Sequence, residues 1–298
     1  MPTPRELQKF YMQGKNITSI MRGEQNLQHN TEAIIELAYD LQSGSYLAAL
    51  DKESTRDHKK AYTTEIAKTI LSLCNPLSIL EAGVGEATTL SGVLQSLNTS
   101  AKFYGFDLSW SRIAYARRWL NSNGISDVTL CTGSLLQIPF ADNSMDLVYT
   151  SHSIEPNGGN EKPILEELYR ITRKYLVLLE PGYELASPEA RHRMNHYGYC
   201  KGLVEISKSL GFSVLKHDFF RYTANPLNPT AITIIKKDSE SRSTYTLACP
   251  KYKTPLEEIG SVMFSPEALV VYPIIDGIPC LRTENGVLAS HFKEFTEN

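Results

Sequence analysis

Two glycines that follow an acidic residue form the pattern in this sequence that most suggests chemistry. The segment reads ILEAGVG, with Glu81, Gly83 and Gly85 between an apolar, strand-like run and a helix-like one. Residues without a Cβ let the backbone pass close to a ligand, and the free N–H groups of the following helix favour polar ligand atoms. A dinucleotide fingerprint would require glycine at position 88, where the chain has Thr88. The pattern therefore predicts a cofactor site in which a pyrophosphate is not favoured.

Acids at the ends of the first two predicted strands narrow the choice of cofactor. The Glu81 carboxylate would repel a diphosphate but can pair with an ammonium, such as that of the methionine part of S-adenosylmethionine (SAM). Asp107 follows the second strand, where doubly wound nucleotide-binding folds place an acid that accepts the ribose hydroxyls. Capping of the next helix is the alternative role for Asp107. Together the two acids predict a SAM site.

The segment after the third predicted strand is expected to line the adenine part of the cofactor. Residues 132–136 read TGSLL, and a parallel sheet would bring them to the same carboxyl edge as the two acids. We therefore expect Ser134 and Leu135 beside the adenine ring. Each part of SAM would then face the end of one strand.

A polar loop, residues 151–160, follows the fourth predicted strand and would lie beside the SAM sulfur. Because ligands of open α/β sheets bind outside the carboxyl ends of the strands, we expect Ser151 at the cofactor and Asn157 at the substrate. His152 is a candidate general base, since an imidazole with a pKa near ~6.5 can take a proton from a hydroxyl or amine. Glu155 is the second candidate catalytic residue. A structural role for both, in holding the loop, is the alternative.

Further substrate contacts are expected after the fifth predicted strand. Tyr183 lies at the same carboxyl edge, and His192 and His196 follow on a helix-like segment. The two histidines are four residues apart, a spacing that can bind a metal, but no third ligand is evident and no metal is predicted. A solvated helix surface explains them equally well.

Apolar segments that alternate with helical patterns indicate how these residues are positioned. Alternation of this kind is typical of βαβ units around a parallel sheet. Two final strands without a helix between them predict an antiparallel hairpin. The expected strands are 77–82, 102–107, 128–131, 145–151, 175–180, 212–220 and 230–237, and the expected helices are 88–97, 111–121 and 162–172. The predicted fold is α/β, with a doubly wound, seven-stranded, mostly parallel sheet.

These motifs resemble those of class I SAM-dependent methyltransferases of the small-molecule type. The resemblance covers residues 62–237 and includes the acid-x-Gly-x-Gly pattern, the acid after the second strand and DLV in the fourth. It implies a Rossmann-like methyltransferase fold, SAM as the cofactor and methyl transfer as the activity. Family members often have glycine where Ala87 stands and aspartate where Ser134 stands. The N-terminal segment resembles the aromatic lids that cover SAM, which implies a cofactor contact for Tyr46.

Three parts are expected along the chain: a helical cap or lid over 1–60, a SAM-binding domain over 61–238 and a small segment over 245–298. The last segment is similar to zinc-ribbon-like domains that accompany some tRNA and protein methyltransferases, but its CPKY sequence lacks their second cysteine. Cys249 and Cys280 cannot supply the roughly four ligands of a thiolate zinc site. We predict a degenerate, metal-free segment of α+β or β structure that packs on the main domain.

Composition limits the partners of the protein. The 298 residues carry a formal net charge of -3, so the dense positive field that nucleic-acid binding usually requires is not expected. No apolar stretch approaches the ~20 residues that cross a bilayer. We expect a cytoplasmic protein with a small-molecule substrate and without a membrane partner, and leave a homodimer open.

The predicted reaction is an in-line transfer of the SAM methyl group to a polar small molecule, such as a sugar or another biosynthetic intermediate. A protein or RNA methyltransferase is one alternative. A non-catalytic SAM-binding or interaction protein is another. A nicotinamide oxidoreductase is less consistent with the sequence because of Thr88.

Overall fold

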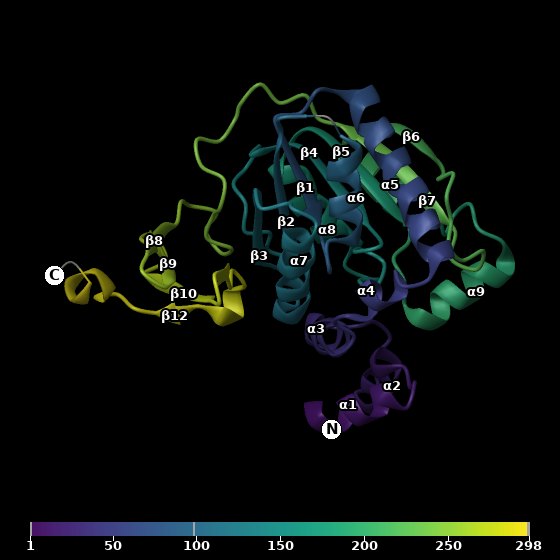
Figure 1. The fold of residues 1–298 in the computed structure, drawn as a ribbon, viewed down its shortest axis with the longest axis horizontal. Helices are drawn as coiled ribbons and strands as arrows, with labels where there is room; N and C mark the ends of the chain where they lie inside the picture. The colour runs from purple at the N-terminus through teal and green to yellow at the C-terminus, as the bar shows by residue number, and fades with distance from the viewer. Residues whose placement is uncertain (1, 98, 297–298) are drawn as a thin grey trace.

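A computed structural model describes residues 2–97 and 99–296 of the chain. Its centre is a seven-stranded sheet in the order β3-β2-β1-β4-β5-β7-β6 (Figure 1). The first five strands are parallel, and β7 runs antiparallel to β5 and β6 on either side. The strands are β1 (Ser78–Ala82), β2 (Lys102–Asp107), β3 (Val128–Thr132), β4 (Met145–Ser151), β5 (Thr172–Pro181), β6 (Ser213–Phe219) and β7 (Thr230–Lys236). The predicted fold class and hairpin are confirmed.

Helices cover both faces of this sheet. Neighbouring residues of a strand point to opposite faces, and on β1 Ile79 joins the core under α5, α6 and α7 while Leu80 joins the core under α8 and α10. The helices are α5 (Glu53–Leu73), α6 (Thr88–Ser96), α7 (Trp110–Ser122), α8 (Glu161–Ile171) and α10 (Leu203–Ser209). The three predicted helices are confirmed as α6, α7 and α8, with small differences at their ends. The sheet is therefore doubly wound, as predicted.

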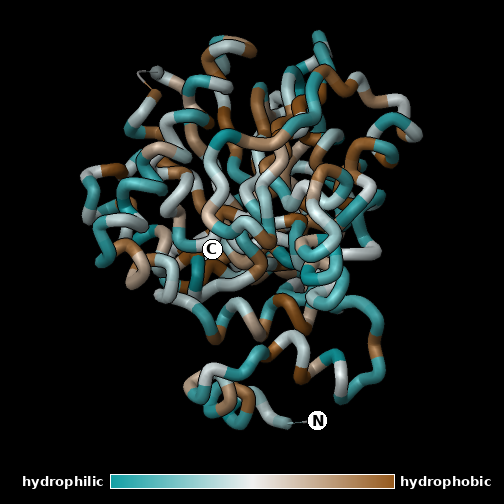
Figure 2. The backbone as a smooth tube through the Cα atoms, turned by 90° about the vertical axis from the view of Figure 1, so that its right-hand side faces the viewer, coloured by the Kyte–Doolittle hydropathy of each residue, from teal (hydrophilic) through white to brown (hydrophobic). Residues whose placement is uncertain are grey.

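The N-terminal part is helical. Its helices are α1 (Pro4–Met12), α2 (Ile17–Glu24), α3 (Glu32–Leu41) and α4 (Ser45–Ala49). A small core of Leu7, Ile17, Met21, Ile34 and Ala38 joins the first three, which lie below the main body in Figures 1 and 2. Helix α5 crosses the domain boundary expected at residue 60. It packs on α6 and so belongs to the helical layer that covers one face of the sheet.

The C-terminal part packs on the main domain, as expected. It forms a second sheet of β8 (Glu257–Ile259), β9 (Val262–Ser265), β10 (Val270–Ile275), β11 (Ile278–Pro279) and β12 (Val287–Leu288). Cys280, just after β11, bridges in parallel to Thr132 at the end of β3. Cys249, Tyr272 and Leu281 are buried in the same core as α8. No helix in the described part of the chain is both long and apolar enough to cross a membrane.

Candidate active site

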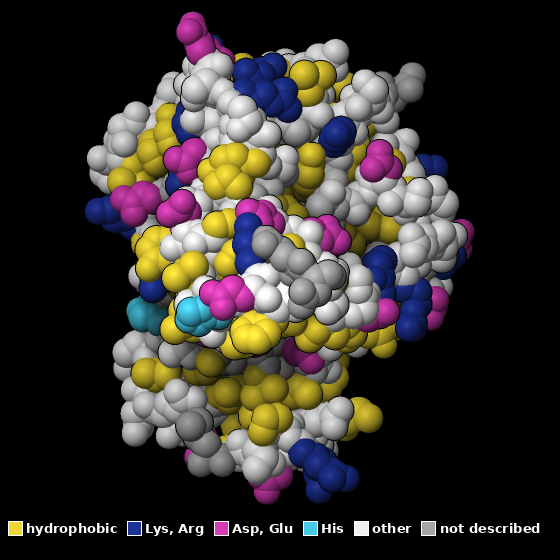
Figure 3. Space-filling view, turned by 90° about the vertical axis from the view of Figure 1, so that its left-hand side faces the viewer, with side chains coloured by type: hydrophobic (Ala, Val, Ile, Leu, Met, Phe, Trp, Pro, Cys, Tyr) yellow, Lys and Arg dark blue, Asp and Glu magenta, His cyan; other side chains and the backbone are white. Residues whose placement is uncertain are grey.

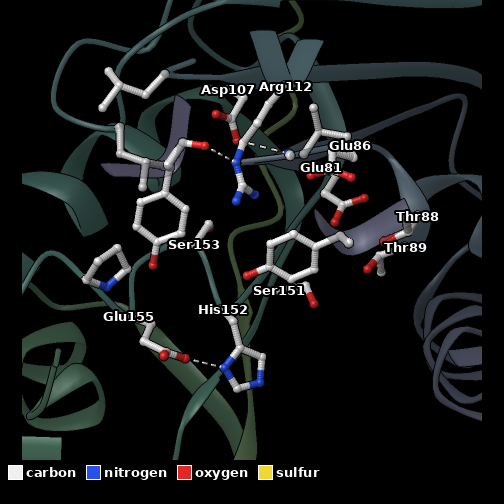
Figure 4. A pocket seen from close by; sticks show the side chains of 18 of the residues that line it. Glu81, Glu86, Thr88, Thr89, Asp107, Arg112, Ser151, His152, Ser153 and Glu155 are labelled. Carbon is white, nitrogen blue, oxygen red and sulfur yellow. Dashed lines mark hydrogen bonds and ion pairs between the residues drawn. The ribbon is translucent and has the colours of Figure 1, made fainter. Parts of the chain in front are cut away.

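A cavity of about 440 Å³ opens at the carboxyl edge of the sheet, where β1, β2 and β4 end. Helices α3, α4 and α5 contribute to its walls. Figure 4 shows Glu81 beside Thr88 and Thr89 on one side, Asp107 with Arg112 above, and His152 with Glu155 at the opposite end. The volume suits a small molecule, and the place is where open α/β sheets bind ligands.

The glycine loop has a geometric reason for its composition. Gly83 and Gly85 adopt φ of 75° and 54°, in the left-handed region that glycine tolerates. A Cβ on Gly83 would lie 2.2 Å from the Cβ of Ser153, in the loop after β4. Glycine at position 83 is therefore required by the neighbouring loop as well as by any approach to a cofactor, a second constraint that sequence reasoning did not foresee.

Glu81 and Asp107 both line the cavity with their carboxyl groups engaged by the protein. Glu81 is buried and accepts a hydrogen bond of 2.8 Å from the Tyr149 hydroxyl, and burial raises the pKa of its carboxyl to about 8. Asp107 accepts the N–H groups of Gly85 at 2.9 Å and Ser109 at 3.0 Å, so it also orders the glycine loop. Burial raises the pKa of Asp107 as well. The structure thus brings together the two acids that the sequence singled out.

The turn after β3 separates two residues that we expected to act together. Leu135 lines the cavity, with Gly133 and Leu136. Ser134 is buried and outside the cavity lining, and its Oγ accepts the N–H of Leu136 at 3.0 Å. The expected adenine contact of the Ser134 side chain is therefore not supported, because the hydroxyl closes its own turn.

His152 and Glu155 form a partly buried pair in the loop after β4. His152 has a left-handed φ of 57°, and its Nδ1 lies 2.5 Å from Glu155 Oε2 while its Nε2 lies 2.8 Å from Thr230 Oγ1. Burial alone would lower the pKa of His152, but the hydrogen bond and charge of Glu155 raise it above its ordinary value. Burial alone would raise the pKa of Glu155, but the hydrogen bond from His152 lowers it below its ordinary value. Both ring nitrogens of His152 are therefore engaged within the protein.

A residue that sequence reasoning missed, Glu180, holds this loop in place. It is buried at the end of β5, and its carboxylate accepts the N–H groups of Ser153, Ile154 and Glu155 at 3.0–3.2 Å. Burial raises the pKa of Glu180 to about 7. The position of this polar loop therefore depends on a neighbouring strand.

Ser151 and Asn157, the other two predicted residues of this loop, both line the cavity. The Ser151 hydroxyl lies 2.9 Å from that of Tyr62, on α5. Asn157 Nδ2 donates to the Ser153 carbonyl at 3.1 Å. Their expected roles at the cofactor and at the substrate remain predictions.

An aromatic lid, which we define as residues 39–47, covers the side of the cavity near Asp107. The guanidinium of Arg112, on α7, lies 4.8 Å from the ring centroid of Tyr39 and 4.7 Å from that of Tyr46. The buried Glu86 carboxylate accepts the N–H groups of Gly44 at 3.0 Å and Leu47 at 2.9 Å. Tyr46 lines the cavity as expected, and Glu86 ties the lid to the glycine loop.

Tyr183, His192 and His196 are not brought to the cavity. Both histidines are exposed on α9 (Pro188–Tyr197), and the Tyr183 hydroxyl accepts a hydrogen bond from Asn195 on the same helix. The two histidines are exposed to solvent and Tyr183 packs against α9, so none of the three lines the cavity. Among the described residues, no group of three or more His, Cys, Asp or Glu could hold a metal ion.

Comparison with known proteins identifies the domain. Residues 79–175 match a family described as methyltransferase domain. Residues 79–175 therefore belong to a methyltransferase domain. The match confirms the predicted resemblance and SAM as the cofactor, and the cavity with its two acids fits that molecule. The zinc-ribbon likeness of the C-terminal segment stays a prediction.

Relatives of this methyltransferase domain are distant. Demethylmenaquinone methyltransferase of Geobacillus stearothermophilus is 27% identical over 94 residues, which are 32% of this chain and 40% of that protein. Sarcosine/dimethylglycine N-methyltransferase of Aphanothece halophytica is 23% identical over 166 residues, 51% of this chain and 60% of that protein. The matched region thus spans less than two thirds of either relative.

Solved structures share the fold of the methyltransferase domain. Magnesium protoporphyrin IX methyltransferase of Synechocystis PCC 6803, with bound S-adenosylhomocysteine (SAH), aligns with a TM-score of 0.54 and 14% identity, covering 72% of this chain and 100% of that one. A complex of the Haloferax volcanii Trm112 methyltransferase activator with a methyltransferase gives 0.50 and 16% identity, covering 66% and 96%. At these identities the similarity concerns the fold alone.

Proposed function

We propose that the protein transfers the sulfonium methyl group of SAM to a polar small-molecule acceptor. The observation that carries this proposal is a single cavity that joins the two cofactor acids to the polar pair His152–Glu155. Glu81 would bind the ammonium of the methionine part and Asp107 the ribose hydroxyls, with Leu135 at the adenine. Gly83, Gly85, Ser151 and Tyr46 would complete the cofactor contacts.

The reaction would be an in-line displacement. A nucleophilic O, N or C of the acceptor forms a bond to the methyl carbon as the carbon–sulfur bond breaks, which leaves SAH and an acceptor that must lose a proton. Alignment of the nucleophile within the cavity supplies much of the rate enhancement. His152 and Glu155 would orient the acceptor. His152 can take the proton only when its imidazole is neutral and the contact between Nε2 and Thr230 is released. Asn157 would contact the acceptor.

The size and cover of the cavity favour a small acceptor over a macromolecule. The named acceptors of two relatives, demethylmenaquinone and sarcosine or dimethylglycine, are small molecules. On the face that Figure 3 shows, Lys and Arg side chains are interspersed with Asp and Glu instead of forming a basic patch. These observations count against an RNA substrate.

The test is a calorimetric titration of the whole chain with SAM, SAH and NAD, repeated on Asp107→Ala. We expect micromolar binding of SAM and SAH, no binding of NAD, and at least tenfold weaker SAH binding by the variant, as expected for a lost charge-assisted hydrogen bond. A screen of small acceptors with methyl-labelled SAM then identifies the substrate. Failure to bind SAM and SAH would overturn the proposal.

A further inference from the structure

A basic and an acidic side chain face the same side of the cavity without a salt bridge between them. Lys59, on α5, and Glu81, on β1, both line the cavity. The Lys59 Nζ donates to Thr89 Oγ1 at 3.1 Å, and Glu81 accepts from the Tyr149 hydroxyl. No salt bridge within 4.0 Å joins Lys59 to Glu81, although each charge affects the ionisation of the other. Lys59 thus bonds to a neutral hydroxyl, and Glu81 bonds to a neutral hydroxyl and to the backbone N–H of Leu90.

The surroundings of Lys59 favour an anion. Thr88 and Thr89 begin helix α6, and Ala87, the residue before them, provides no side-chain cap. The first N–H groups of a helix favour negative charge, and Glu81 already accepts that of Leu90. All three of Lys59, Thr88 and Thr89 line the cavity, so a ligand in it can reach them.

A ligand that carries both charges on neighbouring atoms would match this arrangement. An α-amino acid has its ammonium and carboxylate on one carbon, so both can be bound at once by an acid and a base that are close but not paired. Partly buried charges are costly when they lack an ionic partner, and a zwitterion would supply one to each side without adding net charge.

We infer that Lys59 and the Thr89 hydroxyl bind the α-carboxylate of the amino-acid part of the cofactor, opposite Glu81, which binds its α-ammonium. This inference rests on the proposed function. Lys59 is then a positioning residue for the reaction, because anchoring of the amino-acid end fixes the sulfur and its methyl group relative to the acceptor. It also selects for cofactors that retain a free carboxylate.

The test compares two ligands on matched variants by calorimetry. SAH carries the amino-acid part, and 5′-methylthioadenosine lacks it while keeping the adenosine. For Lys59→Gln we expect SAH affinity to fall at least tenfold, as for the loss of one partner of a charged contact, with methylthioadenosine affinity unchanged. Lys60→Gln, an exposed neighbour on the same helix, is the control and should bind both ligands as the unchanged protein does.

Other outcomes separate this inference from the proposed function. If Lys59→Gln weakens both ligands equally, or neither, the inference is overturned while the proposed cofactor stands. Unchanged methylthioadenosine binding also shows that the variant is folded. If the unchanged protein binds neither SAM nor SAH, the proposed function is overturned and the inference with it.

Discussion

The two ends of the chain both influence the cavity, but in different ways. The N-terminal lid contributes Tyr39 and Tyr46 directly to its lining. No residue of the C-terminal segment, 245–296, lines it. That segment instead contacts the walls from outside: Arg282 pairs with Glu36, on helix α3, which leads into the lid, and Cys280 bridges to the end of β3.

The comparison shows that a segment can shape a binding site without touching its ligand. Thr283 bonds to Gln137, in the turn that carries Leu135, and Arg117, on α7, pairs with Asp276. Residues that line the cavity lie on α3, on α7 and in the turn after β3. The C-terminal segment therefore supports the cavity from three sides. The lid should therefore govern ligand contacts, and the C-terminal segment should govern stability and only indirectly affinity.

The largest expected effect is on stability, at Tyr272 in the C-terminal segment. This side chain is 2% exposed and shares a core with the central sheet. We expect Tyr272→Ala to lower the free energy of unfolding by about 3–5 kcal/mol, in one cooperative transition measured by urea denaturation. Tyr252→Ala, at an exposed site of the same segment, is the control. A separate early transition would show instead that the segment folds on its own.

The next effect is on cofactor affinity, at the link between the lid and the glycine loop. Glu86→Gln weakens the two charge-assisted bonds to Gly44 and Leu47, so the lid should close less firmly. We expect SAH affinity to fall roughly tenfold, or ~1.4 kcal/mol, by calorimetry. Glu53→Gln, exposed at the start of α5, should change nothing. If Glu86→Gln leaves SAH affinity unaltered, the lid does not take part in cofactor binding.

A smaller effect is expected where the C-terminal segment meets helix α3, which leads into the lid. Arg282→Gln removes the ion pair with Glu36, and SAH affinity should fall by roughly threefold, within the ~0.2–1 kcal/mol range of partly exposed pairs. The exchange Arg282→Glu with Glu36→Arg should restore it. Lys293→Gln, which breaks another ion pair of the same segment with Glu257, is the control. If the exchange fails to restore affinity, Arg282 acts through packing and not through its charge.

The smallest difference, none at all, is expected between Arg282→Gln and the unchanged protein in how SAH affinity depends on pH. Burial holds the pKa of Glu81 at about 8 in the free protein, with Lys59 and Asp107 as charged neighbours. Since the ligand ammonium needs the ionised carboxylate, binding at pH 6–8 must release a proton, and SAH affinity should rise with pH toward about 8. Glu86→Gln should let water reach Glu81, which lowers the pKa of its carboxyl and makes SAH affinity depend less on pH. Arg282→Gln should leave this pKa unchanged. A flat profile in the unchanged protein would contradict this account.

Most of the central fold could be predicted because its signals are local. Strand β1, the glycine loop and helix α6 follow one another within 20 residues, each with its own periodicity or turn chemistry. The carboxyl edge of a parallel sheet then places Glu81 and Asp107 together without further information. Ser134 was the exception, since its hydroxyl had a closer partner in its own turn.

The sequence by itself determined the doubly wound sheet, the cofactor loop and its two acids, because alternating apolar runs and glycine turns act over short distances. Only the tertiary structure decided which groups complete the cavity. Lys59 and Thr89 are separated by 30 residues, Gly44 and Glu86 by 42, and Arg282 reaches back to α3. No local pattern marks such pairs, since their contact depends on how helices pack across the sheet.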